Sequence, residues 1–348
     1  MSRAGSNSLL HVAKKSKNDE FYTQLLDIER ELVHYEGHFH DKVVYCNCDD
    51  PHVSNFFEYF FINFKRLGLK KLISACYKEK DLDLLKDSNN TPGFFVTYSG
   101  EKKRKEDVIR DNITYFKGDG DFNSEESIRL LKQSDIIVTN PPFSLFRKYV
   151  DQLVKNNKKF LIIGNINAIT YKEIFKLIKD NNAWLGINLG RGISGFIVPA
   201  HYELYGTEVK IDEQGNRIVS PNNCLWLTNL DHAQRHQEIK LTKTYYDNKA
   251  LYPRYDNYDA INVNKTNDIP YDFEGVMGVP ITFLHKFNPE QFELIKFRKG
   301  EDEKDLSVNG KCPYFRILIK NKRCRPISSN AVINCGKIEQ ERYKLFAL

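Results

Sequence analysis

The chain has 348 residues and a net charge of +6, with 41% hydrophobic and 13% aromatic residues, which excludes a disordered chain and predicts roughly two domains. The excess of Lys and Arg (52) over Asp and Glu (46) is modest, so the distribution of charge is more informative than its total. The longest apolar runs fall far short of the ~20 residues of a membrane span, and the N-terminal segment has no apolar stretch suited to secretion, so we expect a soluble cytoplasmic protein.

The first segments predict a basic arm and the start of an α/β fold. A first basic cluster comprises Lys14, Lys15 and Lys17. Strand-like patterns over 42–48 and 71–76 flank a helical pattern over 53–64. A polar insertion over 78–112 carries the second basic cluster, Lys102 to Lys105, and predicts loops with a peripheral hairpin.

Seven cysteines are scattered through the chain without a CxxC pair, which argues against a zinc ribbon and a disulfide framework. Cys46, Cys48 and the nearby His52 could hold a metal ion, but two buried thiols are the favoured interpretation. The histidines at 34, 38 and 40 are interpreted as scattered surface residues. We therefore expect no metal site.

The middle of the chain continues the alternation of strand and helix. The expected strands cover 113–116, 135–139, 159–164 and 184–189; the expected helices run from an N-cap at Ser124 to Leu131 and over 144–153 and 171–178. This order predicts βαβ units and a parallel sheet covered by helices on both faces. Polar residues follow the strand ends and should converge on one edge, where such sheets bind ligands: Asn47, Asp49, Asp50, Asp119, Asp121 and Asn140.

The pattern changes near residue 190. The segment 190–196 (GRGISGF) is rich in glycine, and 208–220 predicts a hairpin around 214–216. A strand is expected over 224–230. From about 232 onward tyrosine, proline and basic residues dominate, with short strands expected at 279–284 and 314–319 and a third basic cluster at Lys320, Lys322, Arg323 and Arg325. This composition predicts a second, irregular α+β region, and three basic clusters favour a phosphate-backbone partner.

The tetrapeptide Asn140-Pro141-Pro142-Phe143 follows an apolar strand and has a distinct chemistry. The Asn140 side chain and the Pro141 carbonyl offer two oxygens in a stiff turn, and these can accept both hydrogens of one –NH₂ group. The ring of Phe143 can stack on the flat group that carries the amine. Because asparagine cannot act as a general base, the catalysis would be electrostatic and orientational.

This turn resembles the (Asn/Asp/Ser)-Pro-Pro-aromatic motif of amino-group methyltransferases that use S-adenosylmethionine. Further segments resemble the EcoRI-type DNA adenine-N6 methyltransferases: KSKNDEFYTQ (15–24), VVYCNCDDPHVSNFF (43–57), GDGDF (118–122), GRGISGFIVPAHYELYGTE (190–208), NNCLWLTNL (222–230), YDNYDAINVNKTNDIP (255–270), GVMGVPITFLHKFNPEQFELIKF (275–297) and GKCPYFRILIKNK (310–322). The resemblance covers residues 8 to about 322.

The resemblance implies a class I, Rossmann-like S-adenosylmethionine-dependent methyltransferase sheet with an irregular α+β target-recognition region. On this basis the chain divides into a basic arm (1–18), a catalytic domain (19–232) and a target-recognition region (233–348), with 190–222 also contributing to DNA binding. Residues that would hold S-adenosylmethionine are Phe21, Tyr22, Thr23, Asn47, Asp49, Asp50, Cys76, Tyr77, Asp121, Phe122 and Asn140. The turn after the first strand lacks the usual GxG, and which aspartate contacts the cofactor stays open.

Asn140, Pro141, Pro142 and Phe143 would bind an adenine flipped out of double-stranded DNA. Expected DNA contacts are Lys14, Lys15, Arg191, Tyr205, Arg235, His236, Lys286 and Arg316. The resemblance implies a monomeric bacterial modification enzyme that methylates the second adenine of GAATTC. Methylation of an RNA base or a protein glutamine, and a non-catalytic DNA-binding module, are the alternatives.

Overall fold

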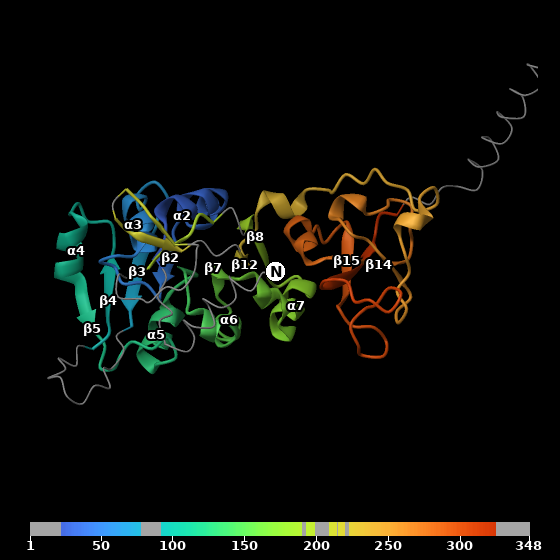
Figure 1. Cartoon of the computed structure of the whole chain (residues 1–348). Helices are drawn as coiled ribbons and strands as arrows, with labels where there is room; N and C mark the ends of the chain where they lie inside the picture. The colour runs from blue at the N-terminus through green and yellow to red at the C-terminus, as the bar shows by residue number, and fades with distance from the viewer. Residues whose placement is uncertain are drawn as a thin grey trace, which may run out of the picture. The chain divides into compact units, whose positions relative to one another are not determined.

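A computed structural model describes residues 22–77, 92–189, 193–198, 209–213, 215–219 and 223–324 of the chain. The chain divides after Ala233 into two compact units, 1–233 and 234–348, and each is described by itself (Figure 1). The predicted boundary between catalytic domain and target-recognition region lies one residue before this division. The predicted basic arm over 1–18 lies outside the described residues.

The first unit is built around an eight-stranded sheet. In spatial order its strands are β5 (Ile113–Tyr115), β4 (Phe94–Tyr98), β3 (Lys71–Cys76), β2 (Val43–Cys46), β6 (Ile136–Thr139), β7 (Lys159–Asn165), β12 (Cys224–Thr228) and β8 (Trp184–Leu189). The four central strands β3, β2, β6 and β7 are parallel, whereas β4 and β12 are antiparallel to their neighbours. The fold is therefore α/β as predicted, but the sheet is mixed. Antiparallel strands need no crossover helix, so the alternation of strand and helix patterns did not reveal them.

Helices cover both faces of this sheet (Figure 1). Helices α2 (Leu25–Leu32) and α3 (Asn55–Ile62) lie on one face, and α5 (Glu125–Gln133), α6 (Phe146–Lys155) and α7 (Lys172–Lys179) on the other. Every residue of β2 and β6 is buried, as expected for strands that are covered on both sides. The predicted N-cap at Ser124 is confirmed, because its hydroxyl accepts the N–H of Ser127. None of the helices in the described ranges is long and apolar enough to cross a bilayer.

The insertion after β3 is more regular than predicted. Beyond residues 78–91, which lie outside the described part, it contributes β4 to the sheet and forms helix α4 (Lys105–Asn112). Val108 and Ile109 of α4 are buried in the same hydrophobic core as Val96 of β4. Burial of these apolar residues explains why a helix forms where loops were expected.

A second, smaller sheet of the first unit joins segments far apart in sequence. Its order is β1 (Tyr22–Thr23), β9 (Phe196–Val198), β11 (Arg217–Val219) and β10 (Val209–Ile211), all antiparallel. Strands β10 and β11 confirm the predicted hairpin around 214–216. The described part of this unit also contains the 3₁₀ helices η1 (Val33–His38), η2 (Phe143–Leu145) and η3 (Ile166–Thr170).

The second unit has its own four-stranded sheet. Its order is β13 (Ala260–Asn262), β14 (Val276–Pro280), β16 (Arg316–Asn321) and β15 (Phe292–Phe297). The 3₁₀ helix η5 (Ala233–His236) lies at the start of the unit, and η6 (Lys249–Leu251), η7 (Thr266–Asp268) and η8 (Ile281–Lys286) follow. The strand predicted over 279–284 is confirmed only for its first two residues and is wrong over 281–284. The strand ends at Pro280, which lacks an N–H for the ladder, and η8 begins there.

Candidate active site

The carboxyl ends of β2, β3 and β6 meet along one edge of the large sheet, because β2 is parallel to both neighbours. The turn 47–50 leaves β2, Tyr77 follows β3, and the turn 140–143 follows β6. Hydrogen bonds join the turn after β2 to the neighbouring strand β3. The N–H of Asp49 donates to the Ala75 carbonyl at 2.9 Å, and the Ser74 hydroxyl donates to the Asp49 carbonyl at 2.7 Å. This is the convergence that the strand pattern predicted.

Asp49 is enclosed within the turn that follows β2. It is 6% exposed, its Oδ1 atom accepts the hydroxyl of Ser54 at 2.8 Å, and its Oδ2 atom accepts the hydroxyl of Thr139. Burial raises the pKa of Asp49 to about 6, although the two hydroxyl bonds lower it. Asp49 therefore ties the turn after β2 to α3 and to the last residue of β6.

Two other polar residues of this turn, Asp50 and Asn47, have different surroundings from Asp49. Asp50 is half-buried, and its Oδ1 atom accepts the N–H of His52 at 2.9 Å. Asn47 is 5% exposed, and its Oδ1 atom accepts the hydroxyl of Tyr149 in α6. The two aspartates that the sequence could not separate thus have different environments.

The loop Gly118–Phe122 packs against the end of β3. Gly120 has a φ of +84°, and a Cβ atom there would lie 2.9 Å from the Cys76 carbonyl oxygen, so the close approach requires glycine. Asp121 is half-buried, and its Oδ1 atom accepts the backbone N–H of Asn123 at 2.6 Å and its side-chain amide at 2.8 Å. The loop therefore approaches Cys76, which is buried at the end of its strand, through the glycine that precedes Asp121.

The turn Asn140–Phe143 leaves β6 at the same edge. Asn140 is half-buried, and its Oδ1 atom is buried. Pro141 is buried, and the carbonyl of Pro142 accepts the N–H of Leu145 at 3.0 Å to begin η2. Phe143 is half-buried and lies edge-on to Phe196 of β9, with ring centroids 6.1 Å apart. The turn thus has a fixed backbone and an aromatic ring supported by the smaller sheet.

Strand β1 brings a polar residue to this region. Thr23 pairs with Phe196, its carbonyl accepts the side-chain amide of Asn55 at 2.8 Å, and Asn55 is the first residue of α3. The Thr23 hydroxyl is buried and makes no hydrogen bond to any residue in the described ranges. A buried hydroxyl of this kind suits a polar ligand, because an unsatisfied one costs about 1–3 kcal/mol. Tyr22 is half-buried, Tyr77 is 43% exposed, and Phe21 lies outside the described residues.

The predicted DNA contacts differ widely in exposure. His236 and Lys286 are exposed, and Arg235 is buried. Arg316 is 9% exposed, and its nitrogens donate to Asn262, Asn264 and the carbonyl of Tyr314. These bonds favour a structural role for Arg316 over a contact with a base. Lys14, Lys15, Arg191 and Tyr205 lie outside the described residues.

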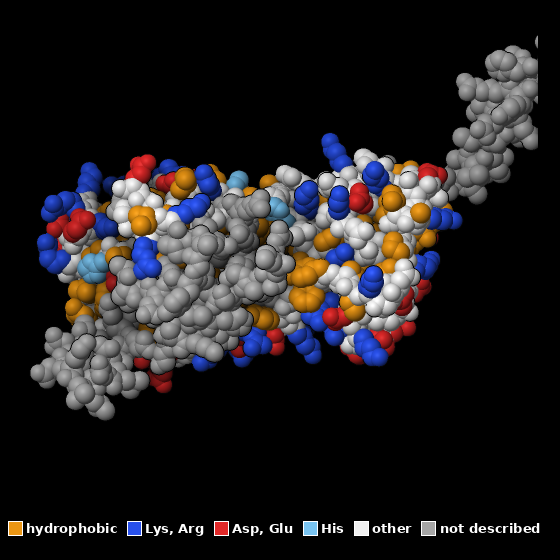
Figure 2. Space-filling model, in the orientation of Figure 1, with side chains coloured by type: hydrophobic (Ala, Val, Ile, Leu, Met, Phe, Trp, Pro, Cys, Tyr) orange, Lys and Arg blue, Asp and Glu red, His pale blue; other side chains and the backbone are white. Residues whose placement is uncertain are grey.

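Many cations of the basic clusters are paired with acids. Around α4, Lys103 pairs with Asp111 at 2.8 Å and Arg104 with Asp107 at 3.1 Å, and Figure 2 shows acidic and basic side chains intermixed in this region. The third cluster is similar, because Arg323 contacts Glu238 and Glu290. Within the described residues, these ion pairs offset part of the positive charge of the second and third clusters.

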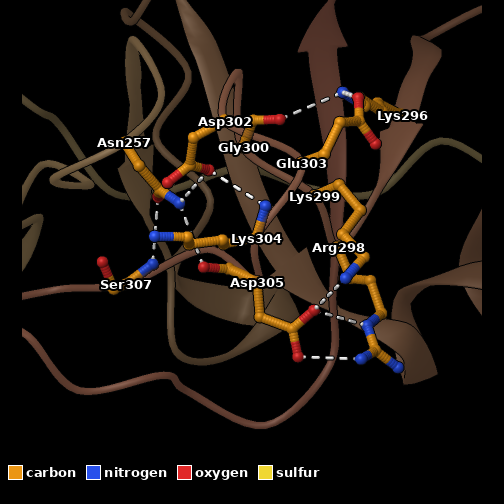
Figure 3. A network of polar contacts seen from close by, with 10 residues as sticks. All are labelled: Asn257, Lys296, Arg298, Lys299, Gly300, Asp302, Glu303, Lys304, Asp305 and Ser307. Atoms are coloured by element: carbon orange, nitrogen blue, oxygen red, sulfur yellow. Dashed lines mark hydrogen bonds and ion pairs between the residues drawn. The ribbon is translucent and has the colours of Figure 1, made fainter.

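The second unit shows the same pairing in the network of Figure 3. Arg298 donates two bonds of 2.8 Å to Asp305, and Asn257 donates to Asp302 at 2.9 Å and to the Asp305 carbonyl at 3.1 Å. Lys299 lies 3.1 Å from Asp305. These contacts fix the loop between β15 and β16 against Asn257, which precedes β13.

No group of three or more His, Cys, Asp and Glu side chains is arranged to hold a metal ion within the part of the chain that the structure describes. His38 instead contacts the Asp231 carbonyl through Nε2 at 2.8 Å.

The residues that connect the loops of the candidate site were not predicted from the sequence. Ser54, Thr139 and Tyr149 carried only the signals of an N-cap, a strand residue and an apolar helix face.

The sequence is similar to known methyltransferases over most of its length. The family model described as adenine-specific methyltransferase EcoRI matches residues 9–322. The Type II methyltransferase M.EcoRI of Escherichia coli is 68% identical over 325 residues, covering 93% of this chain and 99% of that protein. M.MgeORF184P of Mycoplasma genitalium is 38% identical and M.MpnI of Mycoplasma pneumoniae 36% identical, each over 89% of this chain and 98% and 97% of their own lengths. No solved structure matches the chain. The chain therefore belongs to the EcoRI family of adenine-specific methyltransferases and acts as a site-specific DNA adenine methyltransferase of a restriction-modification system.

Proposed function

We propose that this chain transfers the methyl group of S-adenosylmethionine to N6 of an adenine that is flipped out of double-stranded DNA. The proposed target is the second adenine of GAATTC, which follows from the family resemblance, and methylation there would protect bacterial host DNA from a cognate restriction endonuclease. We further propose that the enzyme acts as a monomer in the cytoplasm. Flipping costs a few kcal/mol, which contacts with the extruded base must repay.

The observation that carries this proposal is the placement of the Asn140–Phe143 turn beside two other loops at one sheet edge. The Asn140 side-chain oxygen and the Pro141 carbonyl would accept the two N6 hydrogens, which favours a tetrahedral nitrogen whose lone pair can attack. The Pro142 carbonyl already accepts the N–H of Leu145, so the turn is stiff before the base arrives. Phe143, supported by Phe196, would stack on the adenine.

The same edge supports a cofactor site. Bound S-adenosylmethionine would supply a methyl group on a positively charged sulfur, which is already an activated leaving group. Asn47, Asp50 and the orphaned hydroxyl of Thr23 would contact its amino-acid end, while Tyr22 lies in the same strand as Thr23. Asp121 and Phe122, with Cys76 and Tyr77 at the end of β3, would hold its ribose and adenine.

The order of the large sheet supports the class I assignment. Parallel strands lie at its centre, and the antiparallel strand β12 is inserted between β7 and β8. The second unit is the proposed target-recognition region, together with 190–222. Within it His236 and Lys286 are exposed and suited to DNA contact. Lys14, Lys15, Arg191 and Tyr205 remain proposed DNA contacts on the ground of the family resemblance alone.

Substitution of Asn140 tests the proposed chemistry. Asn140→Ala should lower the rate of methyl transfer to a GAATTC duplex by at least about a hundredfold, because one of the two acceptors for N6 is lost. Asn140→Asp keeps an acceptor oxygen and should retain part of the activity. Affinity for the duplex, measured by fluorescence anisotropy, should stay close to that of the wild type. Turnover of Asn140→Ala within about tenfold of the wild type, or about 1.4 kcal/mol, would contradict the mechanism.

A further inference from the structure

Tyr149 joins three parts of the candidate site. It lies in α6, the helix that follows the Asn140–Phe143 turn, and it is fully buried. Its hydroxyl donates to the Oδ1 atom of Asn47 in the turn after β2. Its ring lies edge-on to Phe122, with centroids 5.2 Å apart and an interplanar angle of 71°. One side chain thus contacts both loops that would hold the cofactor, from the helix that carries the catalytic turn at its start.

The bond from Tyr149 decides what Asn47 can offer a ligand. An asparagine amide has one acceptor oxygen and one donor –NH₂ group on opposite branches. Because Oδ1 accepts from Tyr149, the Nδ2 atom is directed away from that hydroxyl, and it donates to none of the residues that the structure describes. The neighbouring Cys48 thiol also faces Oδ1, at 4.0 Å. Asn47 therefore presents a hydrogen-bond donor.

The neighbouring carboxylate of Asp49 offers hydrogen-bond acceptors, in contrast to the donor of Asn47. Both oxygens of Asp49 accept hydroxyls, from Ser54 and Thr139. The amino-acid end of S-adenosylmethionine has an ammonium, which needs acceptors, and a carboxylate, which needs donors. A donor at Asn47 is matched to the carboxylate.

We propose that Tyr149 is a positioning residue that holds Asn47 as a hydrogen-bond donor to the carboxylate of S-adenosylmethionine. This inference rests on the proposed function, because it assumes that the cofactor binds at this sheet edge. Without the hydroxyl, only the longer contact of the Cys48 thiol to Oδ1 remains, and the orientation of the Asn47 amide is less strongly fixed. The ring of Tyr149 would still support Phe122.

Tyr149→Phe tests this role, because it removes only the hydroxyl. Calorimetry with S-adenosylhomocysteine should show an affinity about tenfold lower than that of the wild type. Affinity for 5′-methylthioadenosine, which lacks the amino-acid carboxylate, should not change. In steady-state kinetics the KM for S-adenosylmethionine should rise by a larger factor than kcat falls. Asn47→Ala should cause a similar loss for S-adenosylhomocysteine, and adding Tyr149→Phe to it should cause little further loss.

Tyr98→Phe is the matched control, because the Tyr98 hydroxyl also makes one hydrogen bond, to the Glu101 carbonyl at 2.9 Å, at the opposite end of the sheet. It should bind both ligands as the wild type does. Wild-type affinity of Tyr149→Phe for S-adenosylhomocysteine, or an equal loss for both ligands, would overturn the inference. A wild-type protein that binds neither ligand would instead refute the proposed function.

Discussion

At the scale of single residues, the two aspartates after β2 have separate roles. Both oxygens of the buried Asp49 are taken by hydroxyls, whereas Asp50 is half-buried at the surface of the turn. Asp49 is thus part of the turn itself, because it is buried and each of its oxygens accepts a hydroxyl of a neighbouring element. We therefore expect Asp49 to hold the turn together and Asp50 to face the cofactor's ammonium.

The buried Asp49 should make stability depend on pH in a defined direction. Burial raises its pKa in the folded state from 3.8 to about 6. Between these values the folded state binds a proton that the unfolded state has released, so the contribution of Asp49 to stability falls as pH rises, by about 3 kcal/mol in total. Asparagine does not titrate. The free energy of unfolding of the wild type minus that of Asp49→Asn should therefore decrease between about pH 4 and about pH 7.

Urea denaturation at several pH values measures this difference. Taking the difference between the two proteins removes the pH dependence of all other groups that titrate alike in both. A difference that stays constant across the window, or that increases with pH, would show that Asp49 is not held in the way described.

At the scale of elements, helix α2 anchors the edge strand β8 and the segment before β9. Glu31 is fully buried, and its carboxylate accepts the N–H groups of Ile187 and Asn188 at 2.8 Å each and the hydroxyl of Tyr35 at 2.9 Å. One turn earlier, Asp27 accepts the N–H and hydroxyl of Ser194, just before β9. Two carboxylates of one helix thus fix β8 and the approach to β9, which supports Phe143.

Loss of the Glu31 carboxylate should destabilise the first unit. Glu31→Ala leaves buried N–H groups without acceptors and should lower the free energy of unfolding by about 3 kcal/mol. Glu29→Ala is a matched control on the exposed side of the same helix and should change it by less than about 0.5 kcal/mol. Urea denaturation of both variants measures the two values. A Glu31→Ala protein as stable as the control would mean that this carboxylate does not anchor β8.

The elements that the sequence predicted well are those specified by local patterns. The strands at 71–76 and 136–139 are short, mainly apolar segments, and the turn after the latter is marked by two prolines. The roles of Asp27 and Glu31 could not be predicted, because acidic residues four apart are typical of a solvated helix face. Their burial depends on partners more than 150 residues later in the chain. The bond between Tyr149 and Asn47 spans 102 residues and has no local signal either.

At the scale of the whole molecule, charge is distributed differently from what the basic runs suggested. The net charge is +6, but cations of the second and third clusters pair with acids, as Lys103 does with Asp111 and Arg323 with Glu238. We therefore expect specific DNA contacts to come from a few exposed positions, such as Lys286, more than from a general positive field. These pairs depend on the fold, so they could not be predicted from the basic runs in the sequence.

The most direct test of the account is methyl transfer to defined DNA. The purified protein is incubated with labelled S-adenosylmethionine and two plasmids that differ only in the presence of GAATTC. We predict that label enters only the plasmid that contains the site and is recovered as N6-methyladenine at its second adenine. Equal labelling of both plasmids would contradict the site assignment, and absence of label from both would contradict the enzymatic function.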